Sequence, residues 1–358
     1  MNNVRSRMLD GKELVECKDC YRHEATSGSS SRTSSNDFWL KKHHVQQNIA
    51  NFIKDSPLEP VSSLELRLGN TCNLTCNSCW GYSSSKVNEE RVQLLKKKDL
   101  EQTFRNNWSI EEHIPKNINH WYKTEQYHKN IDAVSKTVNR IYITGGEPTL
   151  IKENRTLLRK LLDGGNKDCF VSFTTNGTQA DGELIDLLRE FPNNEIQISI
   201  DAVGDQAHYV RYPLDWTEFD ANVKKLCAIP NVNIVFYTVV SAYNLYAISD
   251  ILDYVDGLAE HRRVSWYPIF LDHPNYMHTH IWPLYHRQLA RDHLIKTTNN
   301  LKYLLKHISI DAIKKVEEYY LNPAEYLDQQ ENFRRFNARL DSVRGTNFTE
   351  IFKELCLI

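Results

Sequence analysis

The sequence lacks any long hydrophobic run and any excess of charge of one sign. No stretch approaches the roughly 18 consecutive apolar residues of a membrane-spanning helix. Residues 1–7 lack the apolar core of a signal peptide. The formal net charge is −2, which gives no overall basic signature of nucleic-acid binding. Because the chain is long and has no secretory context, a disulfide framework is excluded and a reducing cytoplasm is the expected setting.

What the sequence does contain is a group of three closely spaced cysteines, Cys72, Cys76 and Cys79. Thiolates at such spacing can hold three irons of a 4Fe–4S cluster, which leaves the fourth iron free to bind a ligand. The neighbouring residues are mostly Asn, Thr and Ser, which argues against buried, unliganded cysteines. Zinc is the rival, because Cys17 and Cys20 offer a second CxxC pair.

Six strand-like segments, most of them rich in β-branched or aromatic residues, alternate with helical patterns after residue 60. They are Leu64–Leu68, Arg140–Thr144, Phe170–Thr175, Glu195–Ile200, Val232–Val240 and Val264–Phe270. One helical face contains Leu157, Leu158 and Leu161 and ends at Gly164. Strands that alternate with helices predict a parallel α/β sheet or a partial barrel.

Other segments surround this alternation. The Ser-rich stretch from Ser27 to Ser35 is expected to be a loop or flexible arm. A helix is expected over Phe38–Ile53. A second helix is expected to begin after Asp181, which would be its N-cap. The long connection from Trp80 to Asn139 is expected to carry helices and to influence substrate choice.

Beyond Pro283 the chain reads as helical, with an apolar stripe that ends at Gly345 as a C′ residue. Four histidines cluster around Pro274 and Pro283, and the sequence favours a polar loop there over a metal site. They are His273, His278, His280 and His286.

Unusual residues fall at the carboxyl ends of the predicted strands, where parallel α/β folds build their active sites. They are Cys72, Gly145, Gly146, Glu147, Asn176, Ser199, Asp201 and Asp272.

The glycines let a ligand approach the strand end closely, and a carboxylate beside free carbonyls suits an ammonium group. Ser199 and Asp201 can hydrogen-bond sugar hydroxyls, with a turn or cap role as the alternative. Arg211 can bind a carboxylate, with a surface role as the alternative.

Cys72-x-x-x-Cys76-x-x-Cys79 followed by Gly145-Gly146-Glu147-Pro148 resembles the radical S-adenosylmethionine (radical SAM) superfamily. The resemblance implies a partial (β/α)6 barrel and a cluster whose open iron binds S-adenosylmethionine. Reductive cleavage then yields a 5′-deoxyadenosyl radical that abstracts hydrogen from the substrate.

Residue by residue, the resemblance implies that the three cysteines bind the cluster. It implies that Gly145, Gly146 and Glu147 bind the methionine amino group. It places Ser199, Asp201 and Arg211 at the ribose or carboxylate region of S-adenosylmethionine.

A wider resemblance, to radical SAM proteins with an N-terminal twitch domain, rests on Cys17-x-x-Cys20, Glu24, Thr174–Gly177 and Arg339–Gly345. It implies an auxiliary iron–sulfur cluster, for which Cys17 and Cys20 are the candidate ligands in a twitch-like remnant with a truncated start. The expected division is a partial twitch-like segment at 1–56, a radical SAM barrel at 57–275 and a helical C-terminal region at 276–358.

The expected function is therefore a radical SAM enzyme that acts on a peptide, a carbohydrate or another small metabolite. The resemblance implies a reductase or a flavodoxin- or ferredoxin-type protein as electron donor, and neither a membrane nor a nucleic acid as partner. The alternatives are a degenerate radical SAM protein and a binding module stabilised by zinc or a cluster. The Gly145-Gly146-Glu147 strand end argues against the zinc module, which has no need of it.

Overall fold

The computed structural model describes residues 7–8, 10–27, 30–40, 61–95, 120–180, 182–304 and 310–356. The chain divides into two compact units, Met1–Pro60 and Val61–Ile358. The finer division expected at residues 56 and 275 stays a prediction. No described helix combines the length and the hydrophobicity that a membrane span requires.

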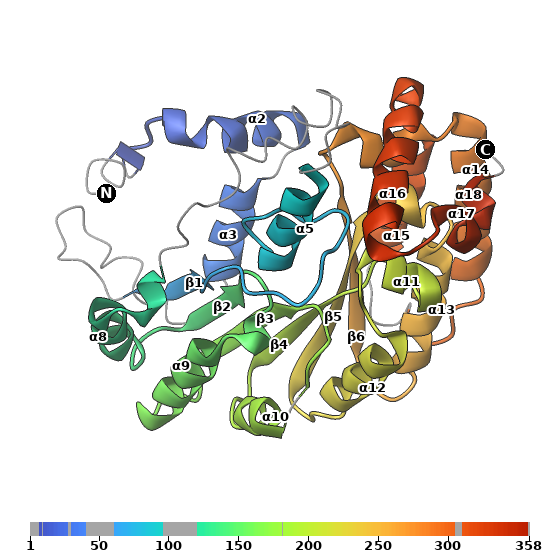
Figure 1. Cartoon of the computed structure of the whole chain (residues 1–358). Helices are drawn as coiled ribbons and strands as arrows, with labels where there is room; N and C mark the ends of the chain where they lie inside the picture. Colours follow the sequence, from blue (N-terminus) through green and yellow to red (C-terminus); the bar gives the residue numbers. More distant parts are fainter. Residues whose placement is uncertain are drawn as a thin grey trace. The chain divides into compact units, whose positions relative to one another are not determined.

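A six-stranded parallel sheet forms the centre of the second unit, with its strands in the order β1-β2-β3-β4-β5-β6. The strands are β1 Ser63–Arg67, β2 Arg140–Thr144, β3 Phe170–Thr175, β4 Asn194–Ser199, β5 Val232–Val240 and β6 Val264–Phe270. The sheet is curved and open between β1 and β6 (Figure 1). This confirms the partial barrel expected from the sequence, with strand bounds that shift by one residue at β1 and β4.

Strands β1 to β4 have a largely apolar face and a largely polar one, because successive side chains point to opposite sides of a sheet. In β2, Ile141 and Ile143 are buried, whereas Tyr142 and Thr144 are half-buried and face the hollow of the sheet. In β4, Ile196 and Ile198 are buried in the same way. A parallel sheet is usually apolar on both faces, so the polar inner face marks a surface built to contact something other than core.

Helices cover the apolar outer face of the sheet, as Figure 1 shows for α9, α10 and α12. The α-helices in the described part of this unit are α5 Ser85–Leu95, α8 Glu125–Val134, α9 Lys152–Asp163, α10 Gly182–Arg189, α11 Gly204–Val210, α12 Trp216–Cys227, α13 Ile248–Ala259, α14 Leu284–Thr298, α15 Ile310–Leu321, α16 Gln330–Arg344, α17 Phe348–Ile351 and α18 Lys353–Cys356. The α9 face with Leu157, Leu158 and Leu161 is buried, as its spacing predicts. Gly164 is the C-cap of this helix.

The C-terminal helices pack on the β6 side of the sheet, where α15 contacts β6 and α14. In α16, Phe333, Phe336 and Leu340 are buried, which confirms the predicted apolar stripe. Gly345 ends the helix with a φ of 68°, in the left-handed region that glycine adopts without strain.

The first unit contains α2 Lys18–Ser27 and α3 Ser31–Leu40. The expected loop over Ser27–Ser35 is therefore wrong for most of its length. The reason is a capping pair: the Ser30 hydroxyl accepts from the backbone N–H of Thr33, while the Thr33 hydroxyl accepts from the N–H of Ser30. A bidentate ion pair between Arg32 and Glu24 also joins the two helices.

Three sequence-based expectations fall partly or wholly on residues that the structure does not describe. Of the helix expected at Phe38–Ile53, only 38–40 are described. The N-cap expected at Asp181 and the central part of the Trp80–Asn139 connection, 96–119, also lie outside the described residues.

Candidate functional site

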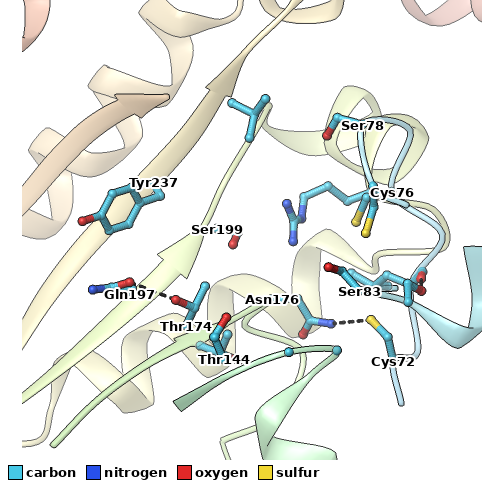
Figure 2. Close-up of a pocket in the computed structure, with 18 of the residues that line it drawn as sticks. Cys72, Cys76, Ser78, Ser83, Thr144, Thr174, Asn176, Gln197, Ser199 and Tyr237 are labelled. Atoms are coloured by element: carbon cyan, nitrogen blue, oxygen red, sulfur yellow. Dashed lines mark hydrogen bonds between the residues drawn. The ribbon is translucent and has the colours of Figure 1, made fainter. Parts of the chain in front are cut away.

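The three cysteines line one cavity of about 580 Å³ at the carboxyl edge of the sheet (Figure 2). The other residues that define this cavity come from the segment around the cysteines, from β2 to β6 and from the segments that follow these strands. They include Thr144, Gly145, Gly146, Thr174, Asn176, Gln197, Ser199, Asp201, Arg211, Tyr237, Val239 and Ile269. The strand-end residues that the sequence singles out therefore meet at one place, with Glu147 and Asp272 as exceptions.

The cysteine loop, residues 72–79, is held by backbone hydrogen bonds to the last residue of α11 and to the segment that follows it. Thr75 N–H donates to the carbonyl of Tyr212 at 2.6 Å, and Asn77 N–H donates to the carbonyl of Val210 at 2.8 Å. On its other side, the loop receives a hydrogen bond from Arg91, whose guanidinium donates to the Cys79 carbonyl at 2.5 Å. The loop is thus fixed at several points between Cys72 and Cys79.

The two glycines after β2 let the backbone of residues 69–71 approach the end of β2 closely. Gly146 N–H donates to the Gly69 carbonyl at 3.2 Å, and Glu147 N–H donates to the Thr71 carbonyl at 2.7 Å. A Cβ at Gly145 would stand 2.8 Å from the Gly69 carbonyl oxygen, and one at Gly146 would overlap the Thr71 carbonyl. The Gly-Gly pair is therefore required to seat the cysteine loop against the end of β2.

Glu147 does not face the cavity, which corrects the expectation that its carboxylate meets a ligand. The side chain is fully buried. It accepts hydrogen bonds from Thr149 N–H at 3.0 Å, the Thr149 hydroxyl at 2.7 Å, the Thr175 hydroxyl at 2.8 Å and Asn176 N–H at 2.6 Å. Burial raises the pKa of Glu147, and the hydrogen bonds from Asn176 and Thr149 oppose that shift. The carboxylate ties the end of β2 to the end of β3.

Asn176 connects the end of β3 to the cysteine loop. Its side-chain amide donates to the Asn73 side-chain oxygen at 2.8 Å and lies 3.9 Å from the Cys72 sulfur (Figure 2). The sequence placed Asn176 at the correct strand end. Its contact with Cys72 depends on the neighbouring loop and has no local sequence signal.

Asp201 and Arg211 form a buried ion pair at the cavity wall. Arg211 Nη1 donates to Asp201 Oδ2 at 2.7 Å, and the other carboxylate oxygen accepts from Val239 N–H at 2.8 Å. Arg211 Nε is buried and has no hydrogen-bond partner within the described part of the chain. The surface role considered for Arg211 is therefore wrong, because the residue is only 8% exposed.

A chain of polar side chains crosses the inner face of the sheet. The Tyr142 hydroxyl lies 2.8 Å from the Thr174 hydroxyl, which donates to Gln197 Oε1 at 2.9 Å. Gln197 in turn donates to Glu195 at 2.9 Å. Since the Thr174 proton points to Gln197, the Tyr142 hydroxyl donates to Thr174 and keeps its oxygen lone pairs available to the cavity.

Two of the cysteine thiols are shielded from solvent strongly enough to alter their ionisation. Burial raises the pKa of Cys76 to about 12, against the opposing effect of Arg211. Burial likewise raises the pKa of Cys79 to about 11. Without a compensating positive charge these groups stay protonated at neutral pH, and a bound metal supplies such a charge.

Comparison with known families identifies the domain that carries this cavity. A family model described as the radical SAM superfamily matches residues 66–213. The chain contains a radical SAM domain. The matched range begins in β1 and ends two residues after Arg211, so it includes the cysteine loop, the Gly-Gly strand end and the ion pair.

Several solved structures align with this chain at low sequence identity. SuiB from Streptococcus suis, bound to S-adenosylmethionine, is 12% identical over 74% of this chain and 54% of that chain, with a TM-score of 0.44. A second, anSMEcpe with bound AdoMet and the Kp18Cys peptide, is 15% identical over 70% of this chain and 64% of that chain, with a TM-score of 0.42.

A third is coproporphyrinogen III oxidase (HemN) from Escherichia coli, 14% identical over 62% of this chain and 47% of that chain, with a TM-score of 0.35. This chain therefore spans about half to two thirds of the length of these three proteins. No curated protein sequence matches the chain.

The radical SAM family implies a 4Fe–4S cluster and S-adenosylmethionine, and the cavity fits both. Three thiols are the soft ligands that iron–sulfur clusters use, and the volume lies within the range of cofactor sites. Within the described ranges, no three His, Cys, Asp or Glu side chains converge on a point for a single metal ion. A zinc ion draws its thiolates to about 2.3 Å from one point, whereas each thiolate of a cluster binds a different iron.

Among the described residues of the second unit, no further cysteine and no histidine lines this cavity. Cys17 and Cys20 are half-buried in the first unit. Of the four histidines considered, His278 and His280 come together, with their Nδ1 atoms 2.7 Å apart. The hydroxyl of Tyr319 lies 2.8 Å from His278 Nε2, and His280 is 2% exposed. Both residues lie in the irregular segment between β6 and α14, as the expected loop implies, and Tyr319 of α15 packs against them.

Proposed function

We propose that this chain holds a 4Fe–4S cluster on Cys72, Cys76 and Cys79 and cleaves S-adenosylmethionine reductively. When bound, the cluster supplies the electron that yields methionine and a 5′-deoxyadenosyl radical, which abstracts hydrogen from the substrate. The observation that carries the proposal is the shared cavity, in which the three thiols lie with the Gly145-Gly146 edge and the Asp201–Arg211 pair.

The other residues of the cavity are proposed to position S-adenosylmethionine. The Gly145-Gly146 edge exposes backbone to the cavity and is proposed to meet the methionine amino group, while Glu147 holds this edge from behind. Ser199 and Asp201 are proposed to face the ribose. The charge of Arg211 suits the carboxylate, and its Nε–H is a buried donor without a partner in the described residues.

The hydrogen-bonding groups on the inner face of the sheet support a polar substrate. Hydroxyl and amide groups of Tyr142, Thr174 and Gln197 lie side by side there, and the Tyr237 and Tyr267 rings stack with their centroids 5.8 Å apart. Such a wall matches the hydrogen-bonding groups of a peptide backbone or a carbohydrate, with other small metabolites less well suited. A reductase or a flavodoxin- or ferredoxin-type protein is the proposed electron donor.

Cys17 and Cys20 are the proposed ligands of a second cluster, in the first unit. Two thiolates are fewer than the three that Cys72, Cys76 and Cys79 supply, so this cluster would need further ligands. A fall in iron content after Cys17→Ala and Cys20→Ala substitution would support the auxiliary cluster. An unchanged iron content would restrict the chain to the cluster at Cys72, Cys76 and Cys79.

The test of the proposed function is the formation of 5′-deoxyadenosine. The protein is reconstituted anaerobically with iron and sulfide, reduced with dithionite and incubated with S-adenosylmethionine. Wild-type protein and a Cys227→Ala control are expected to form 5′-deoxyadenosine, because Cys227 lies in α12 and outside the cavity. Substitution of Cys72, Cys76 and Cys79 by Ala is expected to abolish the product. A wild-type protein that carries a cluster but forms no 5′-deoxyadenosine would point to the degenerate alternative.

A further inference from the structure

The last residue of α16, Arg344, reaches into the cysteine loop from the far end of the chain. Its side chain is 1% exposed, and its five N–H groups are directed at three separate segments. It lies 269 residues from Thr75 in sequence, so no local pattern connects the two. The family model ends at residue 213, which leaves Arg344 outside the matched range.

The hydrogen bonds of Arg344 fall on both halves of the cysteine loop. Nη2 donates to the Thr75 carbonyl at 2.6 Å, and Nη1 donates to the Asn77 side-chain oxygen at 2.6 Å. Thr75 and Asn77 flank Cys76 directly. Their backbone N–H groups donate to the carbonyls of Tyr212 and Val210, so the segment around Cys76 is held both by Arg344 and by the end of α11.

A carboxylate from the helix that follows the loop completes the set. Glu90 of α5, with its side chain 11% exposed, accepts from Arg344 Nε at 2.6 Å and from Nη2 at 2.8 Å. This is a bidentate pair, the strongest form of an Arg–carboxylate contact. Arg344 therefore joins the cysteine loop to α5 with a fork that a lysine ammonium cannot reproduce.

The turn after α16 holds Arg344 in this position. The left-handed Gly345 ends the helix, and Asp341 accepts from the Thr346 hydroxyl at 2.7 Å and from Phe348 N–H at 3.0 Å. The Tyr212 hydroxyl donates to the Arg344 carbonyl at 3.2 Å, and the guanidinium lies 5.0 Å from the Tyr212 ring centroid. The Arg339–Gly345 segment thus holds Arg344 in the position from which it contacts the cysteine loop.

We propose that Arg344 is a positioning residue that orders the Cys72–Cys79 loop for cluster binding. The C-terminal helix α16 is then part of the cluster site, although it contributes no ligand. The inference rests on the proposed function for the identity of the cluster, but the ordering of the loop is a property of the protein alone. A hydrogen bond to a charged group corresponds to about a tenfold or greater shift between ordered and released loop.

The experiment compares Arg344→Lys with a matched control, Arg287→Lys. Arg287 is also completely buried and donates to the backbone carbonyls of Trp282, Tyr320, Asn322 and Ala324, in a part of the fold outside the cavity. Hydrogen–deuterium exchange is measured on the metal-free proteins for peptides that cover 72–79 and 284–298. The rate of iron loss to a chelator is then measured anaerobically on the reconstituted proteins.

Arg344→Lys is expected to speed exchange in peptide 72–79 and iron loss by at least about tenfold, and to leave peptide 284–298 unchanged. Arg287→Lys is expected to show the reverse pattern of exchange and a wild-type rate of iron loss. If Arg344→Lys prevents folding, Glu90→Gln is the milder variant, because it keeps Arg344 and weakens only its carboxylate partner; it is expected to shift both rates in the same direction.

Wild-type exchange and iron loss in the Arg344 variant would overturn the inference, as would equal loop exchange in the two lysine variants. A wild-type protein that binds no cluster would instead overturn the proposed function, and the exchange data would still decide whether Arg344 orders the loop.

Discussion

Substitution of Gly146 by Ala should break the contact between the end of β2 and the cysteine loop. The added Cβ would overlap the Thr71 carbonyl and would stand 2.6 Å from the Asn70 carbonyl carbon. Both are backbone atoms, which cannot rotate away as a side chain would. The Glu147–Thr71 and Gly146–Gly69 hydrogen bonds that join these segments, 2.7 Å and 3.2 Å long, must lengthen or break to make room.

The expected loss in free energy of unfolding is about 1–3 kcal/mol, the range for an overpacked methyl group, with lower iron content after reconstitution. The assay is urea denaturation of the metal-free protein, followed by iron and sulfide determination. Gly257→Ala is the matched control, because Gly257 lies exposed in α13 and a Cβ there meets nothing within 4 Å. This control should be stabilised by about 0.5–1 kcal/mol, since glycine is unfavourable within a helix.

The reasoning fails if Gly146→Ala and Gly257→Ala have the same stability and the same iron content. That result would mean that the backbone of the cysteine loop does not approach β2 as closely as the structure has it.

Two further substitutions test buried ionisable groups. Asp201→Asn should lower the free energy of unfolding by about 3–5 kcal/mol, because it leaves the buried Arg211 without its negatively charged partner. Asp186→Asn is the control in the same urea assay. It affects an exposed ion pair and should have little effect. Burial lowers the pKa of His280 from 6.5 to about 4, so the unfolded chain takes up this proton at higher pH than the folded protein does. Stability should therefore fall as pH drops from 6.5 towards 4, and His280→Gln should reduce the difference between urea midpoints at pH 7 and pH 5; an unchanged pH dependence would contradict the shift.

Much of the sheet and its active edge could be predicted because the signals are local. Runs such as Arg140–Thr144 and Phe170–Thr175 combine β-branched residues with clear ends, and the structure has these two strands with the same bounds. The polar residues that follow successive strands meet at one edge because the strands are parallel. The cavity thus follows from strand order, which the alternation with helices predicts.

The contacts made by Glu147 and Arg344 could not be predicted, because their partners are distant in sequence. The donors to Glu147 include Thr175 and Asn176, at the end of a different strand, and a carboxylate at a strand end is equally suited to a ligand or to buried hydrogen bonds. Arg344 depends on how α16 packs against the loop. The helix α3 was missed for a local reason, since a Ser-rich stretch predicts a loop unless the Ser30–Thr33 cap is recognised.

The central claim is that Cys72, Cys76 and Cys79 hold a cluster with an iron open to S-adenosylmethionine. The most direct measurement is an electron paramagnetic resonance spectrum of the reconstituted, dithionite-reduced protein, recorded before and after addition of S-adenosylmethionine. The proposed function predicts the signal of a reduced 4Fe–4S cluster whose g values change when S-adenosylmethionine is added. A chain that instead carries stoichiometric zinc, with no cluster signal, would contradict it.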